Sequence, residues 1–575
     1  MEALPSKSAV PGRRRFGQHP AVTHFTDFSP AEPDLAHLRT AYDGLLAAAA
    51  ETGPGDLIDV VDRWDDVRQD AWTWLAWARV RYRQDTRDVE ARERRERADQ
   101  AGSELEQLDL QLQRVLLARG ADLSEVPPYA VARWTAAASA LDPAIAERRV
   151  TEQTVVAEYT ALMGSASFDV RGQAYSLTTI SPLLVHPDRA VRHEAQAAKW
   201  AWFAEHGAEL DDLYDRLTKL RAGMATDLGH DDFVQTGYLR MGRVDYGRED
   251  VDRWRREVQR HLVPLGRDLR EAQRERLGMD RLHYWDHGVY ESAGNPVPVP
   301  VPEQAEAAAR AFDGLDDDIA GFWRGMIDRG MMDLPTRPGK AGGGFCTYFS
   351  NLSTPFIFCN GAGVHSDIKT LVHEAGHAYQ KHASRGVRPK QLLHGTADTA
   401  EIHSMSLEFL TWPRLGEFFG DDAEQFRRTH LTESLLFLPY GVAIDHFQHL
   451  VYESPDATPA ERHAMWKSME ERYLPWQDAG DLDHVAGGGA WQQQRHIYNY
   501  PFYYIDYTLA LCCALQFWDA AQDDPDEALT RYKALCALGG SQPFQSLVKA
   551  VGLRSPFEEG CLESVVARAR TWLGL

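Results

Sequence analysis

The sequence predicts a mainly α-helical protein, and three features of its 575 residues support this fold class. Apolar residues recur at intervals of three and four along much of the chain, which is the period of a helix with one buried face. Opposite charges four positions apart accompany them, as expected for exposed helix faces. The clearest run rich in aromatic and β-branched residues, typical of strands, occupies one short region. A chain of this length exceeds one compact core, so two or three lobes are expected.

The N-terminal part is predicted to contain an irregular segment followed by a helical lobe. Residues 1–34 hold scattered Pro and Gly and show no apolar period. Two clear helical patterns follow, at 34–51 and at 88–120, and the second is rich in opposite charges at the helical spacing. We therefore expect packed helices over residues 35–175 and a second, larger domain over residues 176–575.

Two segments rich in Pro or Gly interrupt the larger domain. The run NPVPVPVPE at 295–303 predicts an extended connector, because proline blocks helix formation. A second break, LPTRPGKAGGG, covers 334–344. It is followed at 345–360 by FCTYFSNLSTPFIFCN, the clearest strand signal in the chain. This stretch predicts two short strands joined by a turn at NLST.

Composition excludes several classes of function. The formal charge of −23 disfavours nucleic acid and anionic membranes as partners, since phosphate binding needs clustered Lys and Arg. The N-terminus lacks the apolar stretch of a secretory signal, and no apolar run is long enough to span a membrane. The six cysteines show no paired Cys-x-x-Cys spacing, so neither a disulfide framework nor a cysteine metal site is expected. A reducing, cytoplasmic location is the resulting expectation.

The segment SDIKTLVHEAGHAYQKHA, residues 366–383, carries the strongest chemical motif. It predicts one helix, on which His373 and His377 project from the same side one turn apart. Both imidazoles can then bind one Zn²⁺ through nitrogen. Glu374 is placed to take a proton from the water that a bound zinc would activate. The small residues around Gly376 leave room for another backbone to approach closely.

A catalytic zinc also needs a third protein ligand and one open position. A third histidine in the pattern His-x-x-Gly-x-x-His is excluded, because Gln380 and Ala383 occupy its positions. The following segment ADTAEIHSMSLEFL, residues 397–410, offers carboxylates on one predicted helix. One of Glu401 and Glu408 is expected to bind the metal and the other to support it. Asp398, one turn before Glu401, is predicted to accept the N–H of a ligand histidine.

An aromatic segment near the C-terminus offers hydrogen-bond donors. His496 follows the glycine-rich AGGGAWQQQR, and Pro501 is predicted to start a helix. Tyr500, Tyr504 and Tyr507 then share one face, and a phenol or imidazolium there can donate to a developing oxyanion. The neighbouring Tyr503 is interpreted as a core residue.

These motifs together resemble the thimet oligopeptidase and oligoendopeptidase F family of zinc peptidases. The likeness rests on LVHEAGHA, DTAEIHSMSLEF, GKAGGGFCTYFSNLSTPFIFCN and RHIYNYPFYYIDYTLA, and it is greatest to the oligoendopeptidase F branch. It covers about residues 110–570. The resemblance implies two helical lobes that flank a deep substrate channel, with a small β-hairpin beside the zinc helix. It also implies one Zn²⁺ per chain, and short peptides as substrates.

The resemblance further implies particular roles at the metal. Glu401 matches the family's third zinc ligand, and Glu408 matches the second glutamate of the same motif. Tyr507 and His496 are implied to stabilise the tetrahedral intermediate. The His496-to-tyrosine spacing is one residue shorter than in the thimet branch, so the assignment among the tyrosines stays open.

Substrate contacts are implied as well. Tyr500 and Tyr504 are candidates on the aromatic segment. In such peptidases the substrate backbone lies antiparallel to an exposed edge strand beside the zinc helix. Here that strand is FCTYFSN, with Cys346 and Thr347 as the expected contacts.

The leading functional hypothesis is a zinc endopeptidase that cleaves short oligopeptides, and two alternatives remain. A zinc carboxypeptidase or dipeptidyl carboxypeptidase would need a positive group for the substrate's C-terminal carboxylate, for which Arg495, Lys390 and Arg388 are candidates near the motifs. A non-catalytic peptide-binding protein would be indicated by loss of Glu374 or of a ligand, and all are present. The sequence does not specify the oligomeric state.

Overall fold

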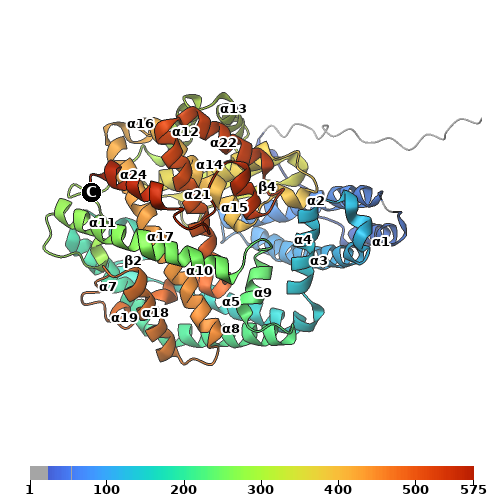
Figure 1. Cartoon of the computed structure of the whole chain (residues 1–575), viewed down its shortest axis with the longest axis horizontal. Helices are drawn as coiled ribbons and strands as arrows, with labels where there is room; N and C mark the ends of the chain where they lie inside the picture. Colours follow the sequence, from blue (N-terminus) through green and yellow to red (C-terminus); the bar gives the residue numbers. More distant parts are fainter. Residues whose placement is uncertain (1–23, 54) are drawn as a thin grey trace, which may run out of the picture.

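The computed structural model describes residues 24–53 and 55–575 and confirms the mainly α-helical fold (Figure 1). The predicted irregular segment 1–34 lies mostly outside the described residues, and its remainder holds one 3₁₀ turn, Phe25–Asp27. The N-terminal helices lie together on one side of the molecule in Figure 1: α1 (Leu35–Glu51), α2 (Leu57–Gln84), α3 (Val89–Ala118) and α4 (Pro128–Ala140). The helices predicted at 34–51 and 88–120 are α1 and α3. Asp34 caps α1 by accepting the N–H groups of Ala36 and His37.

The middle of the chain contributes a second group of helices. They are α5 (Ala146–Ser165), α6 (Ser181–Leu184), α7 (Arg189–Glu205), α8 (Gly207–Asp227), α9 (Phe233–Arg240), α10 (Arg248–Glu257) and α11 (Val263–Arg276). The predicted domain boundary at residue 175 falls at the end of a short hairpin, β1 (Phe168–Val170) and β2 (Gln173–Tyr175). This hairpin was not predicted, because three-residue strands are too short to show an alternating pattern. The division into 35–175 and 176–575 stays a prediction.

The C-terminal half supplies the remaining helices. They are α12 (Gln304–Asp313), α13 (Asp317–Asp328), α14 (Ser366–Ala383), α15 (Ala397–Leu410), α16 (Gly416–Phe419), α17 (Ala423–Glu453), α18 (Pro459–Tyr473), α19 (Asp483–Ala486), α20 (Arg495–Asn499), α21 (Tyr504–Asp523), α22 (Pro525–Leu538), α23 (Phe544–Ala550) and α24 (Glu563–Leu573). Helices α14 and α15 have the bounds that the sequence predicts.

A three-stranded sheet lies beside α14. Strand β4 (Phe345–Phe349) pairs antiparallel with β5 (Thr354–Gly361), which confirms the predicted hairpin. Strand β3 (Met332–Pro335) pairs in parallel with the other side of β5. The sequence does not predict this strand, because it is four residues long and its Leu-Pro end falls in the break at 334–344. The strand order β3-β5-β4 leaves β4 at an edge of the sheet.

The packing around α14 and α15 sets the position of the functional residues. Helix α14 packs against β5 and α15, and α15 packs against α21, so these elements form the centre of the molecule in Figure 1. Helix α2 of the N-terminal group contacts β4. One continuous apolar core runs from Phe25 to Leu573 and joins these layers.

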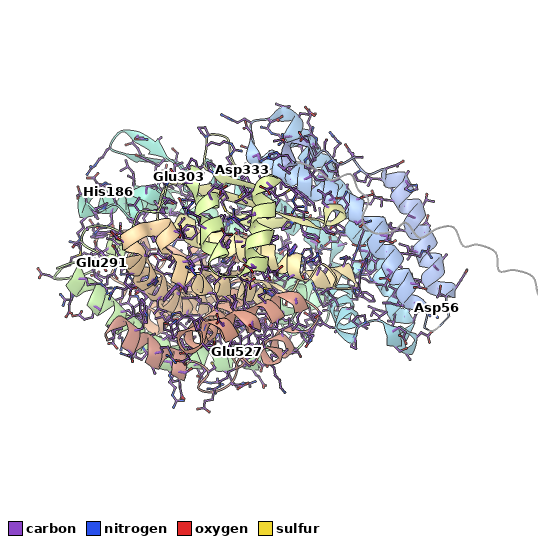
Figure 2. The ribbon with its side chains drawn as sticks, turned by 90° about the horizontal axis from the view of Figure 1, so that it is seen from above. Asp56, His186, Glu291, Glu303, Asp333 and Glu527 are labelled. Carbon is purple, nitrogen blue, oxygen red and sulfur yellow. The ribbon has the colours of Figure 1, made fainter. Side chains whose placement is uncertain are left out.

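Acidic side chains are spread over the surface. The labelled Asp56, Glu303 and Glu527 are all exposed and lie in widely separated parts of the chain (Figure 2). None of the helices in the described parts of the chain is both long and apolar enough to cross a lipid bilayer.

Candidate metal centre

Helices α14 and α15 approach each other so closely that only glycine fits at position 376. A Cβ built on Gly376 would lie 2.6 Å from the Cα of Ser404 and 2.7 Å from the carbonyl oxygen of His403, both backbone atoms. The prediction that a small residue admits a second backbone is thus confirmed. The close approach brings a carboxylate of α15 within reach of the histidines of α14.

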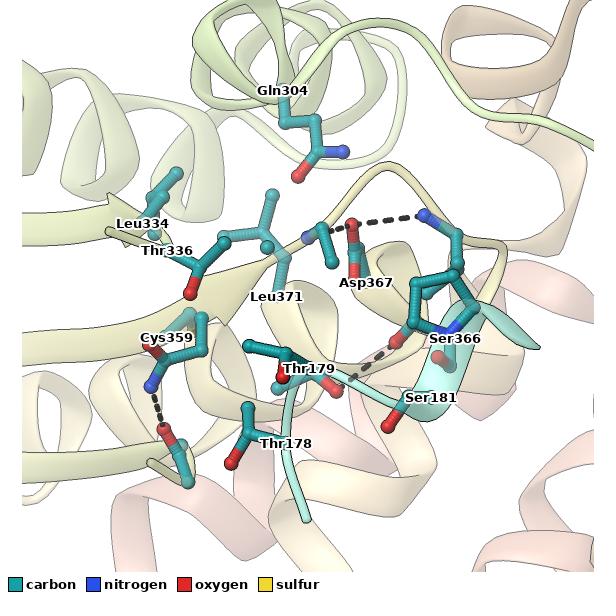
Figure 3. Close-up of a pocket in the computed structure, with 18 residues that line it drawn as sticks. Thr178, Thr179, Ser181, Gln304, Leu334, Thr336, Cys359, Ser366, Asp367 and Leu371 are labelled. Carbon is teal, nitrogen blue, oxygen red and sulfur yellow. Dashed lines mark hydrogen bonds between the residues drawn. The ribbon is translucent and has the colours of Figure 1, made fainter. Parts of the chain in front are cut away.

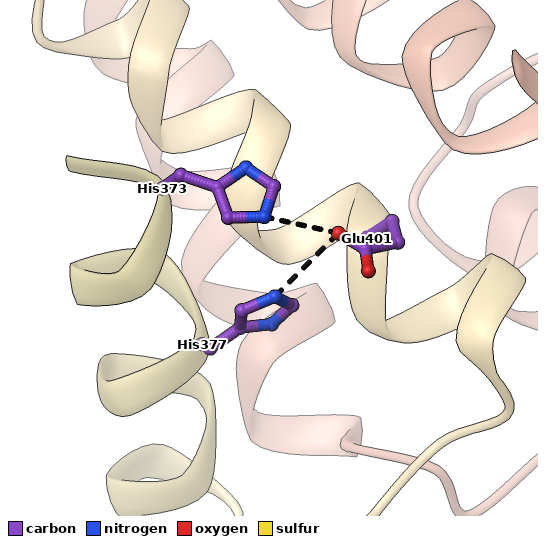
Figure 4. A group of neighbouring side chains, drawn as sticks. All are labelled: His373, His377 and Glu401. Atoms are coloured by element: carbon purple, nitrogen blue, oxygen red, sulfur yellow. Dashed lines mark ion pairs between the residues drawn. The ribbon is translucent and has the colours of Figure 1, made fainter. Parts of the chain in front are cut away.

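Three side chains from these helices converge on one point (Figure 4). The Nε2 of His373 lies 3.1 Å, and the Nε2 of His377 lies 3.5 Å, from the Oε2 of Glu401. The potential ligand atoms of the three residues all lie within 4.8 Å of one another. Ligands bound to one zinc at about 2.0–2.2 Å are themselves roughly 3–3.5 Å apart, so this set fits zinc in type and spacing.

A chain of hydrogen bonds fixes which nitrogen of His373 is free. The indole N–H of Trp412 donates to the Nδ1 of His430 at 3.0 Å, so the proton of His430 is on Nε2. That N–H donates to the Oε2 of Glu408 at 2.8 Å, and the Nδ1–H of His373 donates to the Oε1 of Glu408 at 2.8 Å. His373 therefore presents the Nε2 lone pair to the metal position, as a zinc ligand requires.

Glu408 is ionised in this arrangement. Its burial by itself disfavours the charge, but the hydrogen bonds from His373 and His430 outweigh it and hold the pKa of Glu408 at about 2. The supporting carboxylate therefore keeps its charge at any pH where the histidine is a ligand.

Glu374 is buried and has an unused oxygen. Its side chain is 5% exposed, and within the described residues its Oε2 has no hydrogen-bond partner. Burial raises the pKa of Glu374 to about 7. Its Oε1 faces the start of β4, 3.4 Å from where a Cβ of Gly344 would lie. A carboxyl group with these properties can accept and return a proton near neutral pH.

Aromatic residues from α20, from the turn before α21 and from α21 lie beside the cluster. The ring of His496 lies 5.3–5.9 Å from the rings of Tyr503, Tyr504 and Tyr507. The hydroxyl of Tyr503 donates to the Oε1 of Glu401 at 3.1 Å. Burial, followed by the charge of Arg495, lowers the pKa of His496 to about 4, so this imidazole is neutral at pH 7.

The predicted helix start at Pro501 is wrong. Helix α21 begins at Tyr504, and Phe502 has φ +67°, in the left-handed region that a phenylalanine rarely adopts. The turn is held from distant parts of the chain, because Arg243 donates to the Phe502 carbonyl and the Phe502 N–H donates to Gln448. Tyr500 is consequently off the helix and 62% exposed.

This turn also determines which of the tyrosines lie near Glu401. The interpretation of Tyr503 as a core residue is wrong, since it is half-buried and hydrogen-bonded to Glu401. Tyr507 remains next to Tyr503, with ring centroids 5.1 Å apart. Tyr504 is buried, and its ring lies 6.0 Å from that of Tyr440.

Asp398 does not have the predicted contact. Its carboxylate accepts hydrogen bonds from the Tyr246 hydroxyl at 2.7 Å, from the Thr396 hydroxyl and from the N–H of Thr399. The prediction that it orients a ligand histidine is therefore wrong, and Glu408 makes that contact. Asp398 points away because it lies in the first turn of α15, where it bonds to that helix end.

The predicted strand contacts lie next to Glu374. Cys346 and Thr347 are half-buried on β4, and burial raises the pKa of the Cys346 thiol to about 12. The thiol is therefore neutral and is no candidate nucleophile.

Sequence reasoning missed four supporting residues. Ser404 donates to the Oε2 of Glu401 at 3.1 Å, and its place in the Glu-x-x-Ser motif was a usable signal. Tyr503, His430 and Trp412 come to the cluster through long-range packing, and no spacing in the sequence marks them.

Known proteins share both the sequence pattern and the fold. The models of peptidase family M3 and of the peptidase M3 N-terminal domain match residues 310–567 and 25–122. The chain is 22% identical over 362 residues to oligopeptidase PepF of Bacillus subtilis (strain 168), and that match spans 60% of this chain and 50% of the relative.

Solved structures match over nearly the whole chain. One assigned as an oligoendopeptidase F is 40% identical, with a TM-score of 0.91, over 96% of this chain and 99% of the other. PZ peptidase A in complex with an inhibitor is 38% identical, with a TM-score of 0.91 and the same coverage. An oligoendopeptidase F assigned in Bacillus anthracis str. Ames is 34% identical, with a TM-score of 0.86, over 96% of this chain and 98% of the other. From its two matching family models and its near full-length likeness to these structures, the chain belongs to peptidase family M3, in the oligoendopeptidase F group.

Proposed function

We propose that this protein is a zinc-dependent endopeptidase that hydrolyses internal bonds of short oligopeptides. The observation that carries the proposal is the meeting of His373, His377 and Glu401 beside a buried Glu374 with an unpartnered oxygen. Two neutral nitrogens and one carboxylate are a ligand set of catalytic zinc, and a free carboxylate beside them is what proton transfer needs.

In this proposal His373, His377 and Glu401 hold one Zn²⁺. The ion would supply Lewis acidity, which polarises a carbonyl and lowers the pKa of water. Glu408 keeps His373 in the tautomer that presents Nε2, and Ser404 and Tyr503 hold the Glu401 carboxylate in place.

Glu374 is the proposed general base. Its Oε2 accepts the proton that the attacking water loses, and the same oxygen then returns it to the departing amine. Burial raises the pKa of Glu374 above its usual value, which favours its acceptance of the proton from water.

Tyr507 and His496 are the proposed donors to the oxyanion that forms on the scissile carbonyl. Burial raises the pKa of Tyr507 far above its usual value, so its hydroxyl keeps its proton and can donate it in a hydrogen bond. Tyr500 and Tyr504 are proposed to contact the bound substrate.

The edge strand β4 is the proposed track for the substrate backbone. Its outer side is unpaired in the sheet, and pairing with it, past Cys346 and Thr347, demands little of the substrate's side chains. Glu374 and Glu401 are only 5% and 4% exposed, so a flexible peptide can reach them more easily than a folded protein can.

The test is the variant Glu374→Gln, which keeps the size of the side chain and removes the base. We expect zinc content equal to that of the wild type and loss of peptide hydrolysis, measured by metal analysis and by mass spectrometry of a peptide mixture with and without chelator. Retained hydrolysis by the variant would overturn the role of Glu374. Cleavage of peptides with an amidated C-terminus separates an endopeptidase from an obligate carboxypeptidase.

A further inference from the structure

Two arginines from distant parts of the chain meet at the beginning of the edge strand. The guanidinium of Arg83, near the end of α2, lies over the ring of Phe345 at 5.0 Å from its centroid. The Nη2 of Arg495, the first residue of α20, is 4.0 Å from where a Cβ of Gly343 would lie. The carbonyl of Arg83 accepts the N–H of Ala341, which fixes this end of α2 against the same loop.

Neither guanidinium has an acidic partner. In the parts of the chain that the structure covers, no carboxylate lies within ion-pair distance of Arg83 or Arg495, although the chain has 85 acidic residues. Nearby Arg87, by contrast, pairs with Asp85. Two like charges without a counter-ion repel, and a bound anion would remove that cost.

The two arginines lie beside a cavity whose lining includes the neighbouring Gly343 and Gly344. Both side chains are exposed, yet desolvation by the surrounding protein, followed by repulsion from Arg495, lowers the pKa of Arg83. The exposed ring of Tyr500 influences the same guanidinium. This cavity has a volume of about 370 Å³ and lies at the start of α14 (Figure 3).

The position of the two arginines relative to Glu374 determines which part of a bound peptide would reach them. The Oε1 of Glu374 lies 3.4 Å from where a Cβ of Gly344 would be, and Gly343 and Phe345 are the neighbours of Gly344 in the chain. A peptide paired antiparallel with β4 has its C-terminal portion at the N-terminal end of the strand, where the arginines lie. This step rests on the proposed function and on its substrate track.

We infer that Arg83 and Arg495 bind a carboxylate of the substrate on the C-terminal side of the scissile bond. Guanidinium groups match the geometry of a carboxylate and bind it in a bidentate manner. The carboxylate is either the C-terminus of a short peptide or the side chain of an Asp or Glu. Binding of the C-terminus would favour peptides that end a few residues beyond the cleaved bond, without making the enzyme an obligate carboxypeptidase.

The experiment compares three peptides of otherwise identical sequence on the zinc-loaded enzyme. One has a free C-terminus, one is amidated, and one is amidated with an Asp after the scissile bond. The variants are Arg83→Gln, Arg495→Gln and their combination. The control is Arg63→Gln, an equal charge change at an exposed site of α2, 20 residues and therefore about 30 Å along the helix from Arg83.

We expect the wild type and the control to prefer at least one carboxylate-bearing peptide over the plain amide by about 10-fold or more in kcat/KM, mainly through KM. The double variant should lose that preference, measured within each enzyme as the ratio of kcat/KM for a carboxylate-bearing peptide to kcat/KM for the plain amide. If the double variant loses the preference for the free-acid peptide, the bound carboxylate is the substrate's C-terminus. If it loses the preference for the Asp peptide, the bound carboxylate is a side chain. A wild type without any carboxylate preference, or a double variant that keeps it, would overturn the inference.

A binding measurement separates this inference from the proposed function. Calorimetry with zinc-loaded Glu374→Gln, with and without the two arginine changes, reports carboxylate affinity without turnover. If the wild type hydrolyses no peptide, the proposed function fails, while equal binding of acid and amide peptides would count against the arginine site. Thermal melting curves check that the variants are folded. Substitutions at these exposed residues should change the melting temperature little.

Discussion

Two halves of the candidate active site are built in different ways. The ligand half is made by α14 and α15, where helical spacing alone brings His373 and His377 to one side and Gly376 lets α15 approach. The aromatic half is made by α20, the turn before α21 and α21 itself, where Phe502 adopts a left-handed conformation held by Arg243 and Gln448.

The difference separates what local sequence can specify from what the whole chain must specify. In a regular helix the spacing of two residues in the sequence sets the relative directions of their side chains. The arrangement of the ligand half can therefore be predicted from the motif. A turn held by residues more than 50 positions away has no such rule. We accordingly expect changes in the ligand half to alter metal binding, and changes in the aromatic half to alter catalysis with the metal in place.

The largest effect is expected for Glu401→Ala. Removal of a ligand should weaken zinc binding by more than about 100-fold, because loss of a ligand's supporting partner alone costs about 10–100-fold. Hydrolysis should be lost with the metal. Metal analysis after dialysis against a weak chelator measures this, with Glu424→Ala as the control, a carboxylate on α17 that pairs with Arg427. Zinc content equal to that of the control would assign the third ligand to another acid, Glu408 first.

A smaller effect, of a different kind, is expected for Tyr507→Phe. Loss of a donor to the oxyanion should lower kcat by about 10²–10³-fold while zinc content stays unchanged. Tyr473→Phe is the matched control, because that tyrosine is buried at the end of α18 and its hydroxyl is hydrogen-bonded to the Nδ1 of His446, outside the proposed site. Steady-state kinetics with parallel metal analysis gives both values. An unchanged kcat, or a loss of zinc, would contradict the separation between the two halves.

Prediction from the sequence succeeded where regular elements carry the site. The bounds of α14 and α15 and the hairpin of β4 and β5 follow from apolar periods and from aromatic runs. Glu401 could be separated from Glu408 only by a family resemblance, since both lie on one face of α15. The structure distinguishes them by contact, because Glu408 bonds to Nδ1 of His373 and Glu401 faces Nε2.

Prediction failed where side chains are placed by packing between distant segments. Tyr503 faces Glu401 because the turn at Phe502 is fixed by Arg243, which lies 259 residues earlier in the chain. His430 enters from α17 to hold Glu408, and no motif marks it. Asp398 has the right spacing from Glu401 but is bound to Tyr246. Spacing along a helix gives the direction of a side chain and does not identify its partner.

The smallest effect is expected for Gly376→Ala, which tests how the ligand half is assembled. The added methyl group would meet backbone atoms of Ser404 and His403, so α15 must shift. We expect a loss of about 1–3 kcal/mol in the free energy of unfolding, with weaker zinc binding. The control Gly321→Ala, within α13 and with open space around it, should stabilise by up to about 1 kcal/mol. Equal stability of Gly376→Ala and the wild type in urea unfolding would contradict the close contact.

The proposed ligand set is measured most directly by anomalous X-ray diffraction at the zinc absorption edge from crystals of the zinc-loaded protein. We expect one peak at about 2.0–2.2 Å from the Nε2 of His373, the Nε2 of His377 and a carboxylate oxygen of Glu401, with Glu408 still on the Nδ1 of His373. A peak bound to Glu408, or one away from this cluster, would contradict it.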